Sequence, residues 1–358
     1  MLIVRSPVRI SFAGGGTDLP SYYREYGGAV LSTAINKYFY TILGKRTDDR
    51  IQVISSDLRI FETWQKLETM DVKGTELEIP LAVLKELALG VSVDLFLASE
   101  IPPGTGLGSS ASVCVNILKT LTTYVHQVLT KSDLAERAFH ITHDILGRHI
   151  GKQDEYAAAF GGLNWITFQS DETVRVEPLD LDPGLVRELE SKLMLFFTGS
   201  SHCSWTILEE QEISTRKHVG KAIDALHEVR TLADQMHRSL LKADLAAFGS
   251  LMDEAWKAKK RVSGKISNPR IDRFYELARQ HGALGGKITG AGGGGFLLLY
   301  CEPDCQASVR AALTNEGIQE MAFAFDFQGA QVVANDPFID NDQRGGSRWM
   351  FIPSSNSA

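Results

Sequence analysis

Residues 102–112 read Pro-Pro-Gly-Thr-Gly-Leu-Gly-Ser-Ser-Ala-Ser, a glycine-rich stretch between two apolar patterns. Apolar residues alternate over 91–97, as in a half-buried strand, and recur at helical spacing over 113–121. The glycines therefore lie at a predicted helix N-terminus, where close backbone approach and unpaired amide groups favour a bound anion. Ser109 and Ser110 add hydroxyl groups that would cap the helix, contact a phosphate or reach a bound Mg²⁺.

This loop alone is equally compatible with an ordinary strand-to-helix turn that has a serine cap. It does not contain the G-x-x-x-x-G-K-[ST] pattern of P-loop NTPases. It also lacks the G-x-G-x-x-G pattern with a ribose-binding acid that marks dinucleotide-binding units. The loop thus indicates an anion site without naming its ligand.

The composition is that of an ordinary globular protein, with 358 residues, 44% hydrophobic and 23% charged. A net charge of −7 and the lack of a long basic run argue against a nucleic-acid partner. No apolar run is long enough for a transmembrane helix and no signal peptide is apparent, so we expect no membrane partner and a cytoplasmic location. The four cysteines are expected to be free thiols, since the Cys301 and Cys305 pair lacks the second pair of a zinc ribbon.

Strand and helix patterns alternate along the whole chain, which predicts an α+β fold in two domains. We place the boundary in a polar, proline-containing stretch, giving domains at 1–180 and 181–335 and a loosely held tail at 336–358. Strands are predicted at 2–12, 38–43, 51–54, 91–97, 163–168, 192–197, 296–300 and 323–327. Helices are predicted around 81–87, from 109, from about 133 to 147, over 205–243 and 245–260, from 269, and over 304–315.

Three motifs in order, at 7–18, 102–112 and 286–295, together resemble the GHMP kinase superfamily, which includes galactokinase, homoserine kinase and mevalonate kinase. Within it, residues 12–20, 27–31 and 151–162 are most similar to bacterial D-glycero-D-manno-heptose 7-phosphate kinases. Those enzymes phosphorylate the C1 hydroxyl of the heptose on the way to nucleotide-activated heptose for surface polysaccharide. Fucose kinases carry a related first motif, so that subfamily stays open.

The resemblance implies a ribosomal-protein-S5-like N-terminal domain and a ferredoxin-like C-terminal domain, with ATP and a sugar phosphate bound between them. Mg²⁺ is the implied metal, near Ser109 and Ser110. A homo-oligomer remains possible. The residues that would hold ATP lie in the first and second glycine-rich stretches: Pro103, Gly104, Gly106, Leu107, Gly108, Ser109, Ser110, Gly292 and Gly293.

The resemblance also implies that Asp154 accepts the proton of the sugar hydroxyl and that Arg9 keeps Asp154 ionised and neutralises the transferred phosphoryl group. Without it, Asp154 would be a dipole-complementing residue in a helix first turn and Arg9 an isolated charge on a strand. Asp18 would bind sugar hydroxyls, or else be an ordinary turn residue. The implied sugar-binding set is Gly15, Gly16, Thr17 and Asp18.

Three features leave alternatives open. Family members commonly have a Mg²⁺-binding Glu twelve residues before the catalytic Asp, whereas this chain has Thr142 there, with Asp144 close by. His202 stands where we expect an Arg in close relatives. The basic group at 257–261 would either reach a sugar phosphate or be a solvated helix end. Another sugar kinase and a non-catalytic sugar or nucleotide sensor therefore remain as alternative hypotheses.

Overall fold

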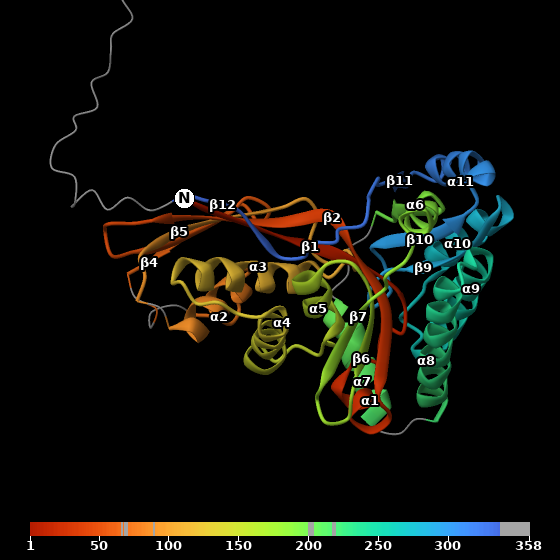
Figure 1. Cartoon of the computed structure of the whole chain (residues 1–358), viewed down its shortest axis with the longest axis horizontal. Helices are drawn as coiled ribbons and strands as arrows, with labels where there is room; N and C mark the ends of the chain where they lie inside the picture. Colours follow the sequence, from red (N-terminus) through yellow and green to blue (C-terminus); the bar gives the residue numbers. More distant parts are fainter. Residues whose placement is uncertain (66, 68–70, 89, 200–203, 217–219, 337–358) are drawn as a thin grey trace, which may run out of the picture.

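The computed structural model describes residues 1–65, 67, 71–88, 90–199, 204–216 and 220–336. Its first sheet has eight strands, of which six lie in the spatial order β12-β1-β2-β5-β3-β4 (Figure 1). Strand β6 pairs with the first residues of β2, 28–33, and β7 pairs with β6. The strands are β1 (Leu2–Ala13), β2 (Gly28–Lys45), β3 (Ile51–Ser55), β4 (Ile60–Trp64), β5 (Val93–Ser99), β6 (Leu163–Phe168), β7 (Val174–Pro178) and β12 (Gln331–Asn335).

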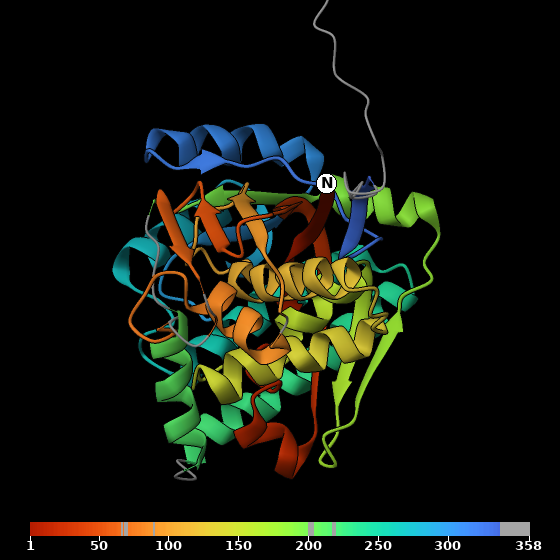
Figure 2. The same ribbon diagram turned by 90° about the vertical axis from the view of Figure 1, so that its left-hand side faces the viewer.

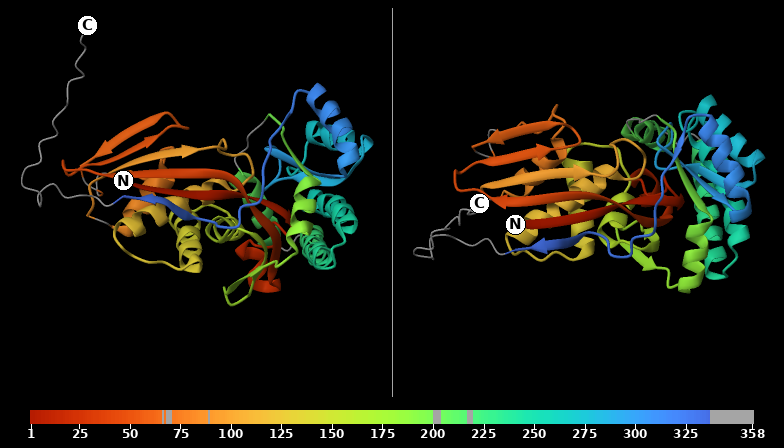
Figure 3. Two further views of the ribbon diagram at one scale, coloured as in Figure 1. Left: turned by 45° about the horizontal axis from the view of Figure 1, so that its top comes forward. Right: turned by 90° about the horizontal axis from the view of Figure 1, so that it is seen from above.

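Helices cover one face of this sheet and leave much of the other face open, as Figures 2 and 3 show. Apolar residues of α3 are fully buried against β1 and β2, which explains the helical spacing of its apolar side chains. Thr130 and Asp133 form a reciprocal capping box that starts α4. The elements of this part are α1 (Pro20–Tyr26), α2 (Glu78–Leu87), α3 (Ser109–Tyr124), α4 (Lys131–Phe139), the π-helical turn η2 (His140–Ile145) and α5 (Gln153–Phe160).

The second sheet has four antiparallel strands in the order β11-β8-β10-β9. Along the chain these are the fourth, first, third and second strands, with helices before β9 and before β11, which is the ferredoxin-like arrangement. Its strands are β8 (Leu193–Phe197), β9 (Ala283–Ile288), β10 (Phe296–Cys301) and β11 (Gln319–Glu320). Its helices are α6 (Pro183–Ser191), α7 (Ser204–Arg216), α8 (Gly220–Leu241), α9 (Leu245–Val262), α10 (Pro269–Gln280) and α11 (Pro303–Asn315).

The two sheets share a hydrophobic core at the C-terminal half of β1. Val8, Ile10 and Phe12 of β1 belong to one buried cluster with side chains of α8, α9 and β10. The rings of Phe12 and Phe248 meet edge to face, with centroids 5.4 Å apart. Arg9 alternates with these residues and therefore emerges from the other face of β1, beside the first glycine-rich loop.

The α+β two-domain architecture predicted from the sequence is confirmed, while four details of the strand prediction need correction. The strand expected at 323–327 is a single bridge between Phe325 and Ile35. The polar stretch at the expected domain boundary forms β7, an edge strand ending at Pro178, and 331–335 forms β12 beside β1. Strand β2 begins ten residues before the predicted 38–43 because its first eight residues are buried on both faces and show no alternation.

Candidate active site

The first glycine-rich loop wraps around the N-terminus of α3 and is fixed to β1. The Arg9 amide donates a hydrogen bond to Leu107 O at 2.9 Å, and the Arg9 Nη1 donates to Gly106 O at 2.7 Å. Gly106 has φ +80°, and a Cβ placed there would lie 2.4 Å from Thr289 O of the second glycine-rich element. Only glycine fits this crossing, which brings the two glycine-rich elements into backbone contact.

Arg9 and Asp154 form a bidentate ion pair at the centre of the site. Nε donates to Oδ1 and Nη2 donates to Oδ2, both at 2.7 Å. Asp154 lies in the first turn of α5 and a quarter of its side chain is exposed, whereas Arg9 is 4% exposed. Burial raises the pKa of Asp154, and the Arg9 guanidinium opposes that shift. The carboxylate is thus held in one orientation with its charge balanced.

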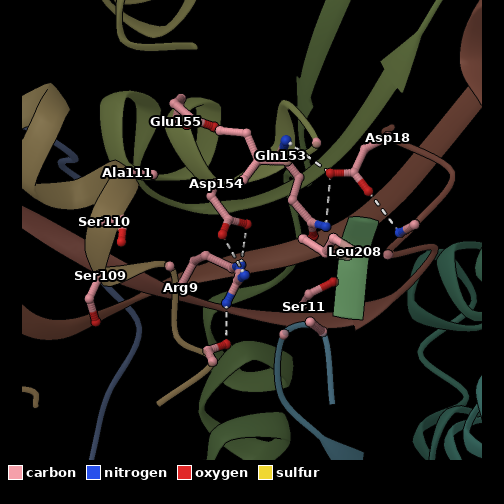
Figure 4. Close-up of a pocket in the computed structure, with 18 of the residues that line it drawn as sticks. Arg9, Ser11, Asp18, Ser109, Ser110, Ala111, Gln153, Asp154, Glu155 and Leu208 are labelled. Atoms are coloured by element: carbon pink, nitrogen blue, oxygen red, sulfur yellow. Dashed lines mark hydrogen bonds and ion pairs between the residues drawn. The ribbon is translucent and has the colours of Figure 1, made fainter. Parts of the chain in front are cut away.

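Asp18 lies on the opposite side of the Arg9–Asp154 pair from the α3 N-terminus, as Figure 4 shows. Its Oδ1 accepts from the Gly16 amide at 2.8 Å, and its Oδ2 accepts from Gln153 Nε2 at 3.0 Å. Ser11 Oγ and Gln153 Oε1 lie 3.5 and 4.0 Å from a Cβ built at Gly15. Both atoms are buried and have no hydrogen-bond partner among the described residues, so they are available to a hydroxylated ligand.

The basic group on α9 divides into three paired side chains and one that enters the site. Lys257, Lys260 and Arg261 form ion pairs with Asp253, Asp272 and Glu228, respectively. Lys259 is 5% exposed and lines the pocket. Its Nζ donates to Gly15 O at 2.8 Å and to Gln211 Oε1 at 3.2 Å, and burial lowers the pKa of Lys259 to about 8.

A second carboxyl group, that of Glu155, lines the pocket beside Thr142. Glu155 is 1% exposed, and its Oε1 accepts from Thr142 Oγ1 at 3.1 Å. Burial and the neighbouring Asp154 raise the pKa of Glu155 well above its ordinary value. Asp144 is instead half exposed and contacts His140 and His143. Asp144 is not among the residues that line the pocket in the described part of the chain.

Two oxygen atoms suit a hard cation in this pocket. Ser109 Oγ and Glu155 Oε2 are both buried without a hydrogen-bond partner in the described structure, and both residues line the pocket. No group of three or more His, Cys, Asp and Glu side chains that could hold a metal ion occurs in the described ranges. Mg²⁺ is suited to such a sparse set, because in proteins it is typically held by one or two carboxylates together with phosphate oxygens and water.

The pocket has a volume of about 270 Å³ and unites most of the residues singled out in the sequence. Those that line it are Arg9, Gly15, Gly16, Asp18, Gly104, Gly106, Gly108, Ser109, Ser110 and Asp154. The second glycine-rich element contributes Gly290 and Ala291 to the lining. The lining does not include Thr17, Pro103, Leu107, Gly292 and Gly293.

Thr17 is fully buried beneath the loop, where its Oγ1 contacts Gly14 O at 2.8 Å. Its role in sugar binding stays a prediction, as does that of the other four residues outside the lining in nucleotide binding. The substitution noted at His202 and the fourth thiol, Cys203, lie outside the described residues. Cys114, Cys301 and Cys305 are free thiols, and none of the described helices could span a bilayer.

Comparison with known proteins agrees with this geometry. Residues 78–162 match the GHMP kinases N terminal domain and residues 236–319 match the GHMP kinases C terminal domain. The D-glycero-alpha-D-manno-heptose 7-phosphate kinase of Campylobacter jejuni is 30% identical over 91% of this chain and 97% of its own length. The chain belongs to the GHMP kinase family. This kinase is therefore a phosphotransferase that uses ATP as co-substrate and acts on a sugar hydroxyl.

Two further relatives extend the comparison. A D-glycero-D-manno-heptose 1-phosphate kinase of Bacteroides thetaiotaomicron superposes with a TM-score of 0.79 at 28% identity, covering 94% of this kinase and all of that chain. The L-fucokinase/L-fucose-1-P guanylyltransferase of Bacteroides fragilis is 26% identical over 86% of this kinase, which matches only 35% of that longer protein. Relatives with different sugars in their names therefore share this fold.

Ser11, Gln153 and Glu155 were not among the site residues predicted from the sequence, and Lys259 was expected only as one of a basic group that would either reach a sugar phosphate or be solvated. Ser11 follows the alternation of β1, two residues after Arg9, so the strand period alone places both side chains on one face. Glu155 follows Asp154 directly, and nothing in its spacing separates it from a solvated helix residue. Lys259 reaches the pocket from a helix of the second sheet, a contact that no local pattern predicts.

Proposed function

We propose that this kinase transfers the γ-phosphoryl group of Mg²⁺-bound ATP to the C1 hydroxyl of D-glycero-D-manno-heptose 7-phosphate. The observation that carries this proposal is the order of groups along the pocket (Figure 4). An anion-binding helix N-terminus lies at one side, the Arg9–Asp154 pair lies at the centre, and a polar region with unpaired Ser11 and Gln153 oxygens lies at the other. The named heptose kinases among its relatives support the choice of sugar.

In this proposal the sugar lies against Gly15, Gly16, Asp18 and Gln153, with its C1 hydroxyl at Asp154. Phosphoryl transfer has a loose transition state, so Asp154 needs to orient the hydroxyl and accept its proton late in the reaction. Arg9 holds both oxygens of Asp154 and adds positive charge close to the transferred group. Bound Mg²⁺ would neutralise charge on the phosphates, with Ser109, Ser110 and Glu155 as the protein groups nearest to it.

Lys259 is the candidate for the phosphate already present on the substrate. It is the basic residue of α9 that lines the pocket, and its ammonium group has donated two of its three hydrogen bonds. A phosphate oxygen would accept the third and would favour the charged form of Lys259. We place the reaction in the cytoplasm, where ATP is supplied, and expect its bisphosphate product to feed nucleotide-activated heptose.

The proposal is tested by ADP release from Mg²⁺ and ATP with heptose 7-phosphate, mannose, fucose, galactose and mevalonate, followed by NMR of the product. We expect a new 1-phosphate from the heptose alone. Asp154→Asn should reduce turnover by about a thousandfold or more, combining loss of the proton acceptor and of half the ion pair, while binding of a non-hydrolysable ATP analogue changes little. Turnover of Asp154→Asn at the unaltered rate would refute its role.

Asp304→Asn is the matched control, because Asp304 also lies in a helix first turn but belongs to α11, away from the pocket. Its turnover should equal that of the unaltered kinase. Activity with fucose instead of the heptose would keep the reaction type and overturn the substrate. Failure of all five substrates, with nucleotide binding intact, would favour a sensor.

A further inference from the structure

A buried carboxyl group without a cation stands out among the charged groups of the pocket. Asp154 is balanced by Arg9, and Asp18 lies near the ammonium group of Lys259. Glu155 is only 1% exposed, yet none of the ion pairs recorded for the described residues includes it. A buried carboxylate without a cation is costly, so this group requires either a proton or a positively charged ligand.

The Glu155 side chain is aimed at the phosphate side of the pocket rather than the sugar side. In Figure 4 it extends to the side of Asp154 on which Ser110 and Ala111 lie, away from Asp18. Thr142 Oγ1 on η2 lies 3.1 Å from one carboxyl oxygen, Oε1, and also 2.8 Å from Ala138 O in the preceding turn. The other carboxyl oxygen, Oε2, is buried and has no hydrogen-bond partner in the described part of the structure. Glu155 and Ser109, which both line the pocket, thus each have one unpaired buried oxygen.

We propose that Glu155 Oε2 is the carboxylate ligand of the Mg²⁺ that accompanies ATP in this kinase, with Thr142 positioning that carboxylate. The inference rests on the proposed function, because it requires nucleotide phosphates at the N-terminus of α3. A serine hydroxyl, one carboxylate oxygen, phosphate oxygens and water make up an oxygen set that Mg²⁺ prefers. Thr142 then has a defined role in this chain: its side chain lies against Oε1 and leaves Oε2 for the metal.

The assignment predicts that the metal site is preserved when the carboxyl group is moved from residue 155 to residue 142, the other partner of this contact. The Thr142 and Glu155 side chains lie 3.1 Å apart, so Thr142→Glu combined with Glu155→Gln keeps one carboxylate and one hydrogen-bonding neighbour at this contact while adding two heavy atoms to the core. Glu155→Gln alone keeps the shape and removes the charge. These two variants separate loss of a metal ligand from loss of packing, because the double change is the more disruptive of the two to the core.

The test measures Mn²⁺ binding by electron paramagnetic resonance. The sample contains the kinase and a non-hydrolysable ATP analogue but no sugar. We expect Glu155→Gln to weaken Mn²⁺ binding by about tenfold or more and the double variant Thr142→Glu, Glu155→Gln to recover most of it. Glu136→Gln is the charge-matched control and should bind Mn²⁺ like the unaltered kinase, since Glu136 pairs with Lys152 outside the pocket lining. Melting temperatures of all variants report folding.

Unchanged Mn²⁺ affinity in Glu155→Gln, with the analogue still bound, would overturn the assignment. So would a double variant that folds but binds Mn²⁺ no better than Glu155→Gln. Because no sugar is present, a kinase that proves inactive on the heptose leaves this result interpretable, so failure of the substrate proposal can be distinguished from failure of the metal assignment. If the unaltered kinase showed no metal-dependent binding of the analogue, both this assignment and the placing of the ATP phosphates would be wrong.

Discussion

Gly106→Ala tests whether the crossing of the two glycine-rich elements sets the shape of the nucleotide site. An alanine Cβ at 106 would lie 2.4 Å from Thr289 O, whereas real contacts of this kind stay above 3.0 Å. The two backbones must therefore separate by at least 0.6 Å. Both elements line the pocket, and a displacement approaching 1 Å at a reacting group costs up to about a hundredfold in rate.

Gly317→Ala separates this effect from ordinary backbone strain. Gly317 has the same φ of +80° as Gly106, but no heavy atom of the described residues lies within 4 Å of the place that an added Cβ would take. Both variants therefore carry a left-handed alanine, costing about 1 kcal/mol of folding stability. Gly106→Ala adds a further 1–3 kcal/mol, roughly the cost of overpacking, unless the loops move apart.

The assay is calorimetric titration with a non-hydrolysable ATP analogue, together with the melting temperature of each variant. We expect both variants to melt a few degrees lower, and Gly106→Ala alone to bind the analogue about tenfold more weakly, equivalent to about 1.4 kcal/mol. If Gly106→Ala bound the analogue as tightly as Gly317→Ala, the close crossing would not shape the nucleotide site and our reasoning would be refuted.

Two buried lysines give further predictions. Lys287 donates to Ser11 O at 2.9 Å, and burial lowers its pKa to about 7. Because the unfolded chain keeps this proton up to about pH 10.4, folding stability should rise between about pH 7 and 10 by up to about 1.4 kcal/mol per pH unit from this group. Lys287→Met should lack this contribution in urea unfolding at pH 7, 8 and 9, and parallel pH profiles for the two proteins would contradict it. Lys259→Gln should weaken binding of heptose 7-phosphate about tenfold but leave the dissociation constant of the same heptose without its phosphate nearly unchanged, both measured by calorimetric titration. Equal changes for both sugars would mean that Lys259 only supports the glycine loop.

The sequence predicts the parts of this molecule that depend on local pattern. The glycine-rich loop before α3 follows from an alternating strand, three glycines and a helical repeat. The resemblance to GHMP kinases then pointed to Arg9 and Asp154, which are 145 residues apart yet form the bidentate pair. Their catalytic role stays a prediction until Asp154→Asn is measured.

The parts that were missed depend on contacts between distant segments. The sequence left open whether the basic group containing Lys259 would reach a sugar phosphate or be solvated, and Lys287 resembles an ordinary strand lysine. Only the packing of the second sheet against β1 buries both side chains. Glu155 is buried and contacts Thr142 on η2, a contact that neither residue's neighbours in the sequence reveal. Strand β12 has three half-buried and two exposed residues, so it carries little hydrophobic signal and is recognised by its pairing with β1.

The return of the chain to the first sheet through β12 has a mechanical consequence. The polypeptide passes to the second sheet after β7 and comes back after β11, so the second sheet is attached at two points. A body held at two points turns about the line that joins them and is restrained from twisting freely. Any opening of the pocket by relative motion of the sheets would therefore be a rotation about the line that joins the two connecting segments. Cutting the chain near residue 329 would remove one of these connections and with it the restraint on twisting.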